Sequence, residues 1–311
     1  MKNALIKGFT VAALAAAVAA CGGSGSSDSD STGTMSLGLT DAPVTDLSQA
    51  NLNITSVEVK SADGESVTIE LAEALDINLL DFQGGKVAQL FEGQEFPAGQ
   101  YEWIRLHLGA DPYVVEASDV NETPVFLFLP SGRQTGLKLN GGFVIPAGGS
   151  ADFTIDFDVK KSIFNAGGNA PANRDKYMLK PSHRLIDNVE AGSIVGKVDV
   201  INLAAQRADT PQACDYDGSV YVYAGSGTTP TDLVFNPETE KMEGPVVAVP
   251  VTNEEQESLF SFKAAFLPAG DYTIAYACQS DDNQTVDDLE FIGVQDVTVI
   301  AKEDALAEII Q

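Results

Sequence analysis

Seven side chains in the first half of the chain are of the types that form polar ligand sites. They are Tyr101, Trp103, Arg105, Lys138, Asp156, Asp158 and Arg184. All lie on or beside segments whose apolar and polar residues alternate, as in β-strands with one face to solvent. Opposite charges on such faces could line a groove for a polar ligand, with the two aromatic rings as its floor. The same charges could instead form cross-strand ion pairs, and the pattern favours this second interpretation.

Acidic residues beside two cysteines form a second candidate site, for calcium. Asp215 and Asp217 follow Cys214, and Asp281, Asp282 and Asp287 follow Cys278. A disulfide would draw these two loops together, and carboxylate oxygens are the hard ligands that Ca²⁺ prefers. Exposed acidic loops are more often only solvated, so calcium remains an alternative, and no other cofactor is expected.

Cys214 and Cys278 are expected to form a disulfide. Both flank predicted strands. The third cysteine, Cys21, is assigned to a lipid modification below, which leaves these two as an even pair. Two buried free thiols are the alternative. The sequence has no C-x-x-C pair, and both of its histidines lie far from these cysteines, so a redox or zinc role is disfavoured.

Residues 1–20 resemble a bacterial export signal. A basic start with Lys2 and Lys7 precedes an apolar run from Phe9 to Ala20. That run is shorter than the ~20 residues that cross a bilayer, so we expect a signal peptide that is removed.

The sequence Val18-Ala19-Ala20-Cys21 closes this segment and resembles the lipobox of bacterial lipoproteins. The resemblance implies that Cys21 becomes the mature N-terminus and carries acyl chains, such as palmitate, that anchor it to membrane lipid. Gly22 follows in place of Asp, which implies sorting to the outer membrane and leaves open which side the protein faces. Residues 21–33 are otherwise small and polar, so we expect a flexible tether.

Signatures of common enzyme classes are missing from the sequence. It contains no G-x-S-x-G elbow, no H-E-x-x-H pair and no glycine-rich phosphate loop. His107 and His183 are the available imidazole bases, and each is expected to be a structural or surface residue. The chain is therefore expected not to be an enzyme, and a hydrolase with paired carboxylates is the least favoured alternative.

The charge of the chain restricts its partners. A formal net charge of −27 over 311 residues repels nucleic acid and anionic lipid head groups, so no nucleic-acid partner is expected. Hydrophobic residues make up 44% of the chain, which is enough for ordinary folded domains.

Short alternating segments predict an all-β protein from Thr34 onward. In Ala151–Val159, for example, Phe153, Ile155 and Phe157 share one face of the expected strand, and further strands are expected over Tyr177–Ile186 and Ser193–Asn202. Strands separated by Gly, Pro and Asp turns favour two antiparallel β-sandwich domains of the immunoglobulin or prealbumin type. We expect these domains at residues 34–188 and 192–301, followed by a tail at 302–311 that forms a short helix or frays.

A turn sequence recurs in both halves of the chain. Phe96–Tyr101 (FPAGQY) and Leu267–Tyr272 (LPAGDY) share one form, and Ile145–Gly148 (IPAG) repeats its first four positions. Pro fixes φ for a turn and Gly accepts a positive φ, so each copy is expected to be a sandwich turn.

Five motifs in the first half occur in a characteristic order. They are Leu39–Pro43 (LTDAP), Tyr101–Leu108 (YEWIRLHL), Ser131–Leu139 (SGRQTGLKL), Ile155–Ser162 (IDFDVKKS) and Tyr177–Pro181 (YMLKP). Residues 34–188 thereby resemble a bacterial lipoprotein domain of unknown function, DUF4382, which implies no activity or catalytic residue. More loosely, Leu267–Tyr276 makes the second domain similar to carboxypeptidase regulatory-like, transthyretin-type sandwiches.

These features predict a lipid-anchored, acidic cell-envelope protein of non-catalytic type. Its β-sandwich domains are expected to bind an unidentified envelope or extracellular ligand, or to act structurally. A calcium-stabilised adhesin and a carbohydrate-binding module are the alternatives, although Trp103 is the one tryptophan in the chain.

Overall fold

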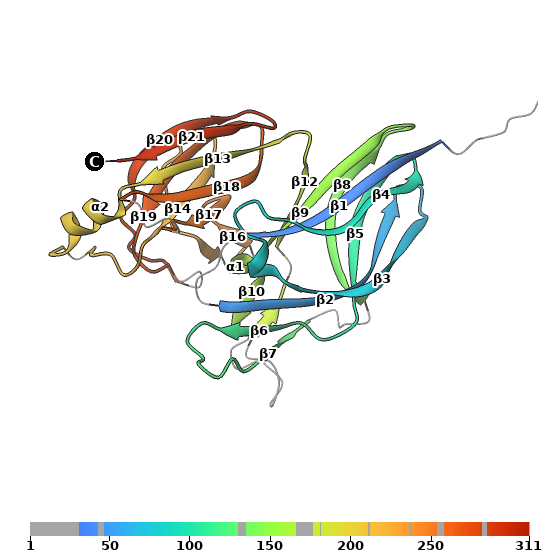
Figure 1. Ribbon diagram of the computed structural model, residues 1–311, viewed down its shortest axis with the longest axis horizontal. Coiled ribbons are helices and arrows are strands. Elements are labelled where there is room, and N and C mark those ends of the chain that lie inside the picture. Colours follow the sequence, from blue (N-terminus) through green and yellow to red (C-terminus); the bar gives the residue numbers. More distant parts are fainter. Residues whose placement is uncertain are drawn as a thin grey trace, which may run out of the picture. The chain divides into compact units, whose positions relative to one another are not determined.

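The computed structural model describes residues 31–42, 47–129, 135–165, 177–180, 182–210, 212–236, 238–239, 241–253, 258–281 and 285–310. The expected signal peptide, Cys21 and most of the tether lie outside these residues. From Ser31 onward the chain forms one compact unit that contains two β-sandwiches, each with its own hydrophobic core (Figure 1). This confirms the predicted all-β fold class.

Two sheets form the first sandwich. The smaller has the order β12-β9-β1-β4 and consists of β1 (Thr32–Ala42), β4 (Ala88–Pro97), β9 (Ser150–Asp158) and β12 (His183–Asp187). The larger has the order β10-β11-β7-β6-β2-β5-β8, with β3 also paired to β2. Its strands are β2 (Leu47–Ser61), β3 (Ser66–Asn78), β5 (Gly99–Leu108), β6 (Tyr113–Glu116), β7 (Val125–Phe128), β8 (Leu137–Ile145), β10 (Ile163–Asn165) and β11 (Tyr177–Leu179). Two short helices, η1 (Leu79–Phe82) and α1 (Val159–Ser162), complete it.

The predicted alternation holds in β9, but two residues of its polar face are buried as well. Phe153, Ile155 and Phe157 are buried in the core between the sheets, as expected. On the opposite face, Thr154 and Asp156 are buried as well, because residues after η1 and strands of the second sandwich surround Asp156 on that side. The polar face of β9 is therefore internal at Thr154 and Asp156, whereas Asp152 on the same face is exposed.

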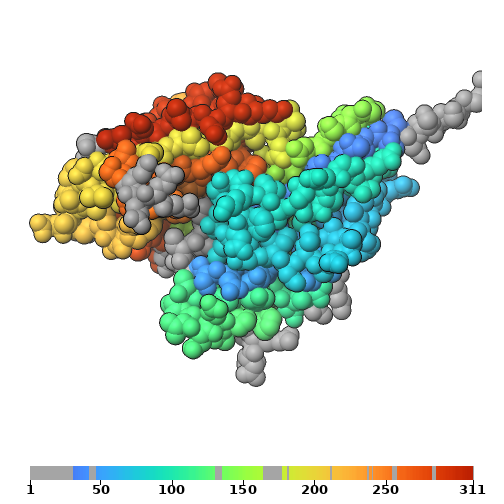
Figure 2. All heavy atoms as spheres, viewed as in Figure 1, coloured from blue at the N-terminus to red at the C-terminus, as the bar shows by residue number. Residues whose placement is uncertain are grey.

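The second sandwich follows the same plan with fewer strands. One sheet has the order β18-β13-β21, from β13 (Ala191–Val198), β18 (Phe260–Pro268) and β21 (Asp304–Ile309). The other has the order β17-β14-β19-β20, from β14 (Ser219–Ala224), β17 (Val247–Pro250), β19 (Gly270–Ala277) and β20 (Ile292–Val299). A hairpin of β15 (Val234–Asn236) and β16 (Lys241–Glu243) and the helix α2 (Val200–Arg207) lie outside these sheets. In Figure 2 the first sandwich is coloured blue to green and the second yellow to red.

Three elements differ from the sequence prediction. The tail expected to form a helix or fray is strand β21, which pairs in parallel with β13 from Ser193 to Val198. The strand expected over Ser193–Asn202 ends at Val198, because Asp199 caps α2 by accepting the Asn202 N–H at 3.3 Å. The strand expected over Tyr177–Ile186 is two strands, β11 and β12, in different sheets. Apolar and polar residues alternate strongly within each of these segments, so the sequence did not show where the strands end.

The sequence predicted antiparallel sandwiches, but both sandwiches contain a parallel strand pair. Strand β1 pairs in parallel with β9 and antiparallel with β4, and β13 likewise pairs in parallel with β21 and antiparallel with β18. In both sandwiches the first strand thus lies between two partners from later in the chain. Within the described residues, none of the helices has the length and apolarity of a membrane-spanning segment.

The repeated turn sequence marks crossings between sheets. Each of its three copies joins a strand of one sheet to a strand of the facing sheet: β4 to β5, β8 to β9, and β18 to β19. In two of them a buried tyrosine closes the corner, because Tyr101 Oη donates to Pro97 O at 2.7 Å and Tyr272 Oη to Pro268 O at 2.8 Å. The sequence repeat therefore encodes a corner that both sandwiches share.

Candidate functional site

Tyr101, predicted as part of a groove floor, instead belongs to the core. Its side chain is 3% exposed and stacks on Phe143 with 5.2 Å between ring centroids. A register shift between Tyr101 and Trp103 interrupts the alternation of β5, so the two rings point to opposite faces of the sheet. The prediction for Tyr101 is therefore wrong.

Trp103, Arg105 and Lys138 gather on the outer face of the larger sheet. The Arg105 guanidinium lies 4.5 Å from the Trp103 ring centroid, and the Lys138 Nζ lies 5.1 Å from it. Arg105 Nη1 also contacts Glu58 Oε2 at 2.9 Å, and His107 Nε2 lies 3.2 Å from the same oxygen. These contacts make a cross-strand cluster of cation–π and ion pairs, which is the interpretation that the sequence favoured.

Asp156, Asp158 and Arg184 lie on the other sheet of the first sandwich. Asp156 is 6% exposed and forms an ion pair with Arg184, whose Nε lies 2.9 Å from Asp156 Oδ2. Asp158 caps α1 by accepting the Lys161 N–H at 2.9 Å, and its other oxygen lies 3.0 Å from Lys161 Nζ. Because the outer faces of two packed sheets point in opposite directions, the seven predicted residues do not share one groove.

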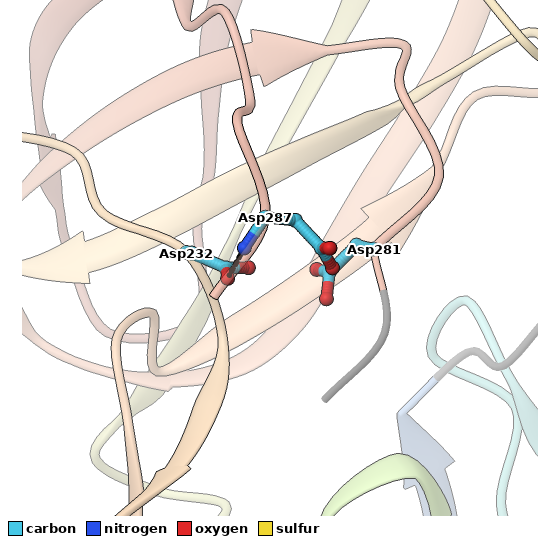
Figure 3. A group of neighbouring side chains, drawn as sticks. All are labelled: Asp232, Asp281 and Asp287. Carbon is cyan, nitrogen blue, oxygen red and sulfur yellow. Dashed lines mark hydrogen bonds between the residues drawn. The ribbon is translucent and has the colours of Figure 1, made fainter. Parts of the chain in front are cut away.

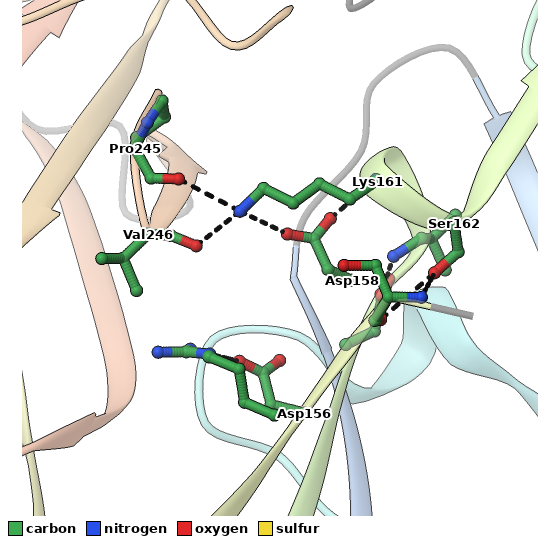
Figure 4. Close-up of polar contacts among 10 residues, drawn as sticks. Asp156, Asp158, Lys161, Ser162, Pro245 and Val246 are labelled. Atoms are coloured by element: carbon green, nitrogen blue, oxygen red, sulfur yellow. Dashed lines mark hydrogen bonds and ion pairs between the residues drawn. The ribbon is translucent and has the colours of Figure 1, made fainter. Parts of the chain in front are cut away.

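The short helix α1 joins the first sandwich to the second (Figure 4). Lys161 Nζ donates to the backbone oxygens of Pro245 at 3.1 Å and Val246 at 2.6 Å. The neighbouring Lys160 Nζ lies 3.0 Å from Asp281 Oδ2. Two lysines of one sequence motif therefore reach across the junction, a role that the sequence alone did not indicate.

Asp41 is a buried carboxyl near the end of β1. Its Oδ1 accepts the Val159 N–H at 2.9 Å, and its Oδ2 accepts from Gln83 Nε2 at 3.2 Å. Burial raises the pKa of Asp41 well above its usual value, and the hydrogen bonds from Val159 and Gln83 offset this only in part.

Asp41→Asn is expected to change how stability depends on pH. The pKa of this carboxyl is higher in the folded than in the unfolded chain, so its contribution to the free energy of unfolding falls as pH rises above about 4. Asparagine does not ionise, so the variant should lose less stability than the wild type between pH 4 and 8. Urea unfolding across this range measures the difference. Asp81→Asn, an exposed control, should keep the wild-type slope, and an equal slope in Asp41→Asn would contradict the prediction.

Three aspartates of the second sandwich converge on one point (Figure 3). Asp232 precedes β15, Asp281 follows β19, and Asp287 precedes β20; one carboxylate oxygen from each lies within 4.8 Å of the others. The Asp287 N–H donates to Asp232 Oδ2 at 2.7 Å, and Tyr221 Oη donates to Asp281 Oδ2 at 2.8 Å. The side chains are thus held in place by contacts from the sheet and from each other.

The electrostatics of this cluster are unfavourable, because the Lys160 ammonium, 3.0 Å from Asp281 Oδ2, offsets at most one of three negative charges. Burial raises the pKa of Asp232 to about 6; the Asp287 N–H opposes this shift, and the charges of Asp281 and Asp287 add to it. Asp232 is 8% exposed, and the Asp281 side chain is 2% exposed. Carboxylates in such a site favour protonation or a bound cation.

The predicted calcium site is only partly the one that the structure forms. Asp281 and Asp287 come together as expected, and Asp282 lies outside the described residues. Asp215 and Asp217 are exposed and are not part of the cluster; a carboxylate oxygen of Asp215 instead accepts the Ser280 N–H at 3.1 Å. Sequence reasoning missed Asp232, because it is a single acidic residue far from both cysteines.

The predicted disulfide between Cys214 and Cys278 is confirmed. Its Cα atoms lie 4.8 Å apart, and the Asp215 N–H donates to Cys278 O at 2.9 Å. The bridge therefore fastens the loop before β14 to the end of β19, directly ahead of Asp281.

A cleft at the junction of the sandwiches was also not predicted. Its volume is about 540 Å³, within the range of small-molecule sites. Leu80, Gln83 and Lys86 line it from the first sandwich, and Pro250, Ser261 and Lys263 line it from the second. No single segment of sequence could show it, because its two walls lie more than a hundred residues apart.

Comparison with known proteins identifies one family. Residues 32–181 match the model of a domain of unknown function, DUF4382. No curated protein sequence is significantly similar to the chain. Among solved structures, the Bacillus anthracis TIE protein is similar at 13% sequence identity and a TM-score of 0.20, over 90% of this chain and 34% of that chain. The major pilin of Streptococcus pyogenes is similar at 12% identity and a TM-score of 0.15, over 90% of this chain and 99% of that one.

At these TM-scores neither structural likeness bears on what this chain does. The family match is more informative, because it spans the five motifs from Leu39 to Pro181 that carry the resemblance. Residues 32–181 therefore match the DUF4382 family, as the order of those motifs indicated.

Proposed function

We propose that this is a lipid-anchored protein of the bacterial outer membrane, and that it presents its two sandwiches as a binding module rather than an enzyme. The lipobox at Cys21 and the small, polar residues that follow it support the anchor. The match of residues 32–181 is to a domain of unknown function, so it adds no activity to this proposal.

The observation that carries the binding role is the cleft at the junction. Both sandwiches contribute to its walls, with apolar contacts from Leu80 and Pro250 and amines from Lys86 and Lys263. A ligand with an apolar part and acidic groups would match these walls. Contacts of Lys161 with Pro245 and Val246 join the two sandwiches that form these walls.

Cys21→Ser is expected to move the protein from the membrane fraction to the soluble fraction. Serine cannot form the thioether that carries the diacylglyceryl group, and an unlipidated chain has no acyl anchor. Fractionation of cells that express each form measures this, together with protease treatment of intact cells to establish which side the protein faces. A variant that stays with the outer membrane would contradict the proposed anchor.

Photo-crosslinking from the cleft tests the binding role. A photoreactive residue at Ser261, exposed within the cleft, should capture one discrete partner in intact cells. The matched control places the same residue at Val294, which is 52% exposed on the second sandwich and does not line the cleft. Equal capture from both positions, or none from Ser261, would contradict a ligand cleft.

A further inference from the structure

We propose that Asp232, Asp281 and Asp287 of the second sandwich bind a calcium ion. The geometry of their carboxylates is the first reason. Two oxygens bound to one Ca²⁺ at 2.3–2.6 Å can be up to about 5 Å apart. One oxygen from each of the three aspartates satisfies this limit, with no pair further apart than 4.8 Å. A point between the three oxygens lies within about 2.8 Å of each, so small side-chain movements bring all three to the coordination distance of Ca²⁺.

The second reason is a pair of buried oxygens without partners. Asp232 Oδ1 and Asp281 Oδ1 are buried, and neither has a hydrogen-bond partner within the described part of the chain. The second oxygen of each residue is occupied, by the Asp287 N–H and by Tyr221 Oη respectively. Buried carboxylate oxygens ordinarily have partners, and an unpaired one indicates a missing ligand. Here the two unpaired oxygens belong to the same cluster.

The charges of the site fit a divalent ion. Three carboxylates and the Lys160 ammonium, 3.0 Å from Asp281 Oδ2, leave two negative charges uncompensated. The donor set consists of oxygen alone, which favours calcium or magnesium over transition metals. Calcium fits better, because it accepts irregular geometry from loops and takes water for its remaining ligands, whereas magnesium requires a near-ideal octahedron.

The ion would join Asp232 to Asp281 and Asp287 beside an aromatic cluster. Tyr221, Tyr223 and Phe291 pack together on the outer face of the β14–β19 pair. Tyr221 joins this cluster directly to Asp281.

Calcium titration of the folded protein tests the proposal. In 10 mM calcium the midpoint of thermal unfolding should rise by about 3 to 5 °C, and EDTA should reverse this. Calorimetric titration should give a Kd of about 0.1–1 mM, as in extracellular calcium modules. An unchanged midpoint in 10 mM calcium, or a larger rise with magnesium at equal concentration, would overturn the assignment.

Two matched variants locate the ion. Asp232→Asn should abolish the calcium response, because it removes one ligand charge and keeps the side-chain shape. Asp217→Asn changes an exposed aspartate of the predicted but unformed site, and should keep the full response. The reverse pattern would place the ion beside Asp217 and overturn the proposal.

Terbium luminescence provides a test on the wild-type protein, independent of any variant's stability. Tb³⁺ occupies calcium sites, and a nearby tyrosine transfers its excitation to the bound ion. Tyr221 contacts Asp281, so excitation of tyrosine should give terbium emission that calcium displaces. Tyr221→Phe should reduce this emission at least two-fold. Emission that calcium does not displace would count against the site.

Discussion

Replacement of both Cys214 and Cys278 by serine is expected to lower the free energy of unfolding by about 4 kcal/mol. The disulfide joins residues 64 positions apart, so in the unfolded chain it closes a long loop and removes much conformational freedom. Loss of the bond restores that freedom and stabilises the unfolded state. Urea unfolding of the two proteins, followed by circular dichroism, measures the difference.

Reduction provides the control for this experiment. A thiol reductant should destabilise the wild type to nearly the level of the double variant, and should leave the variant unchanged. The folded structure should survive, because Asp215 still donates its N–H to Cys278 O and β19 keeps both neighbouring strands. A loss below 1 kcal/mol would show that the unfolded chain is already compact around this loop.

Phe157→Ala is expected to lower the free energy of unfolding by about 3 to 5 kcal/mol. Phe157 is fully buried in the core of the first sandwich, and its strand β9 lies between β1 and β12. Truncation removes buried apolar surface and leaves a cavity that a packed sheet cannot close completely. Urea unfolding of the variant gives the value directly.

Phe126→Ala is the matched control for this substitution. Phe126 is 53% exposed at the surface of β7, and its described ring contact is with Tyr113. The same truncation should cost less than about 1 kcal/mol there. Similar losses of unfolding free energy at both positions would contradict the prediction that Phe157 stabilises the core by its packing.

Local pattern was enough to predict most strands and the fold class. The alternation in β9 correctly placed Phe153, Ile155 and Phe157 in the core, because a strand with one buried face repeats every two residues. The same rule failed at Tyr101, where a register shift reverses the face without any strong local signal.

Long-range pairing explains the other failures. The segment Asp304–Ile309 reads as a short helix or a frayed end by its own sequence, and becomes a strand because β13 offers it an edge. Asp232 likewise has no neighbouring acidic residue that would suggest a metal ligand. It acquires that chemistry only where the fold brings Asp281 and Asp287 to it.

The central place of β1 also governs how the first sandwich would respond to mechanical load. A pull through the chain ahead of Thr32 acts along the length of β1. Hydrogen bonds to β9 on one side and β4 on the other run across that direction. They are therefore loaded in shear and must break together, whereas a terminal edge strand would peel away one bond at a time. Under the proposed anchor at Cys21, a drag force on the folded unit would therefore be carried by β1 in shear.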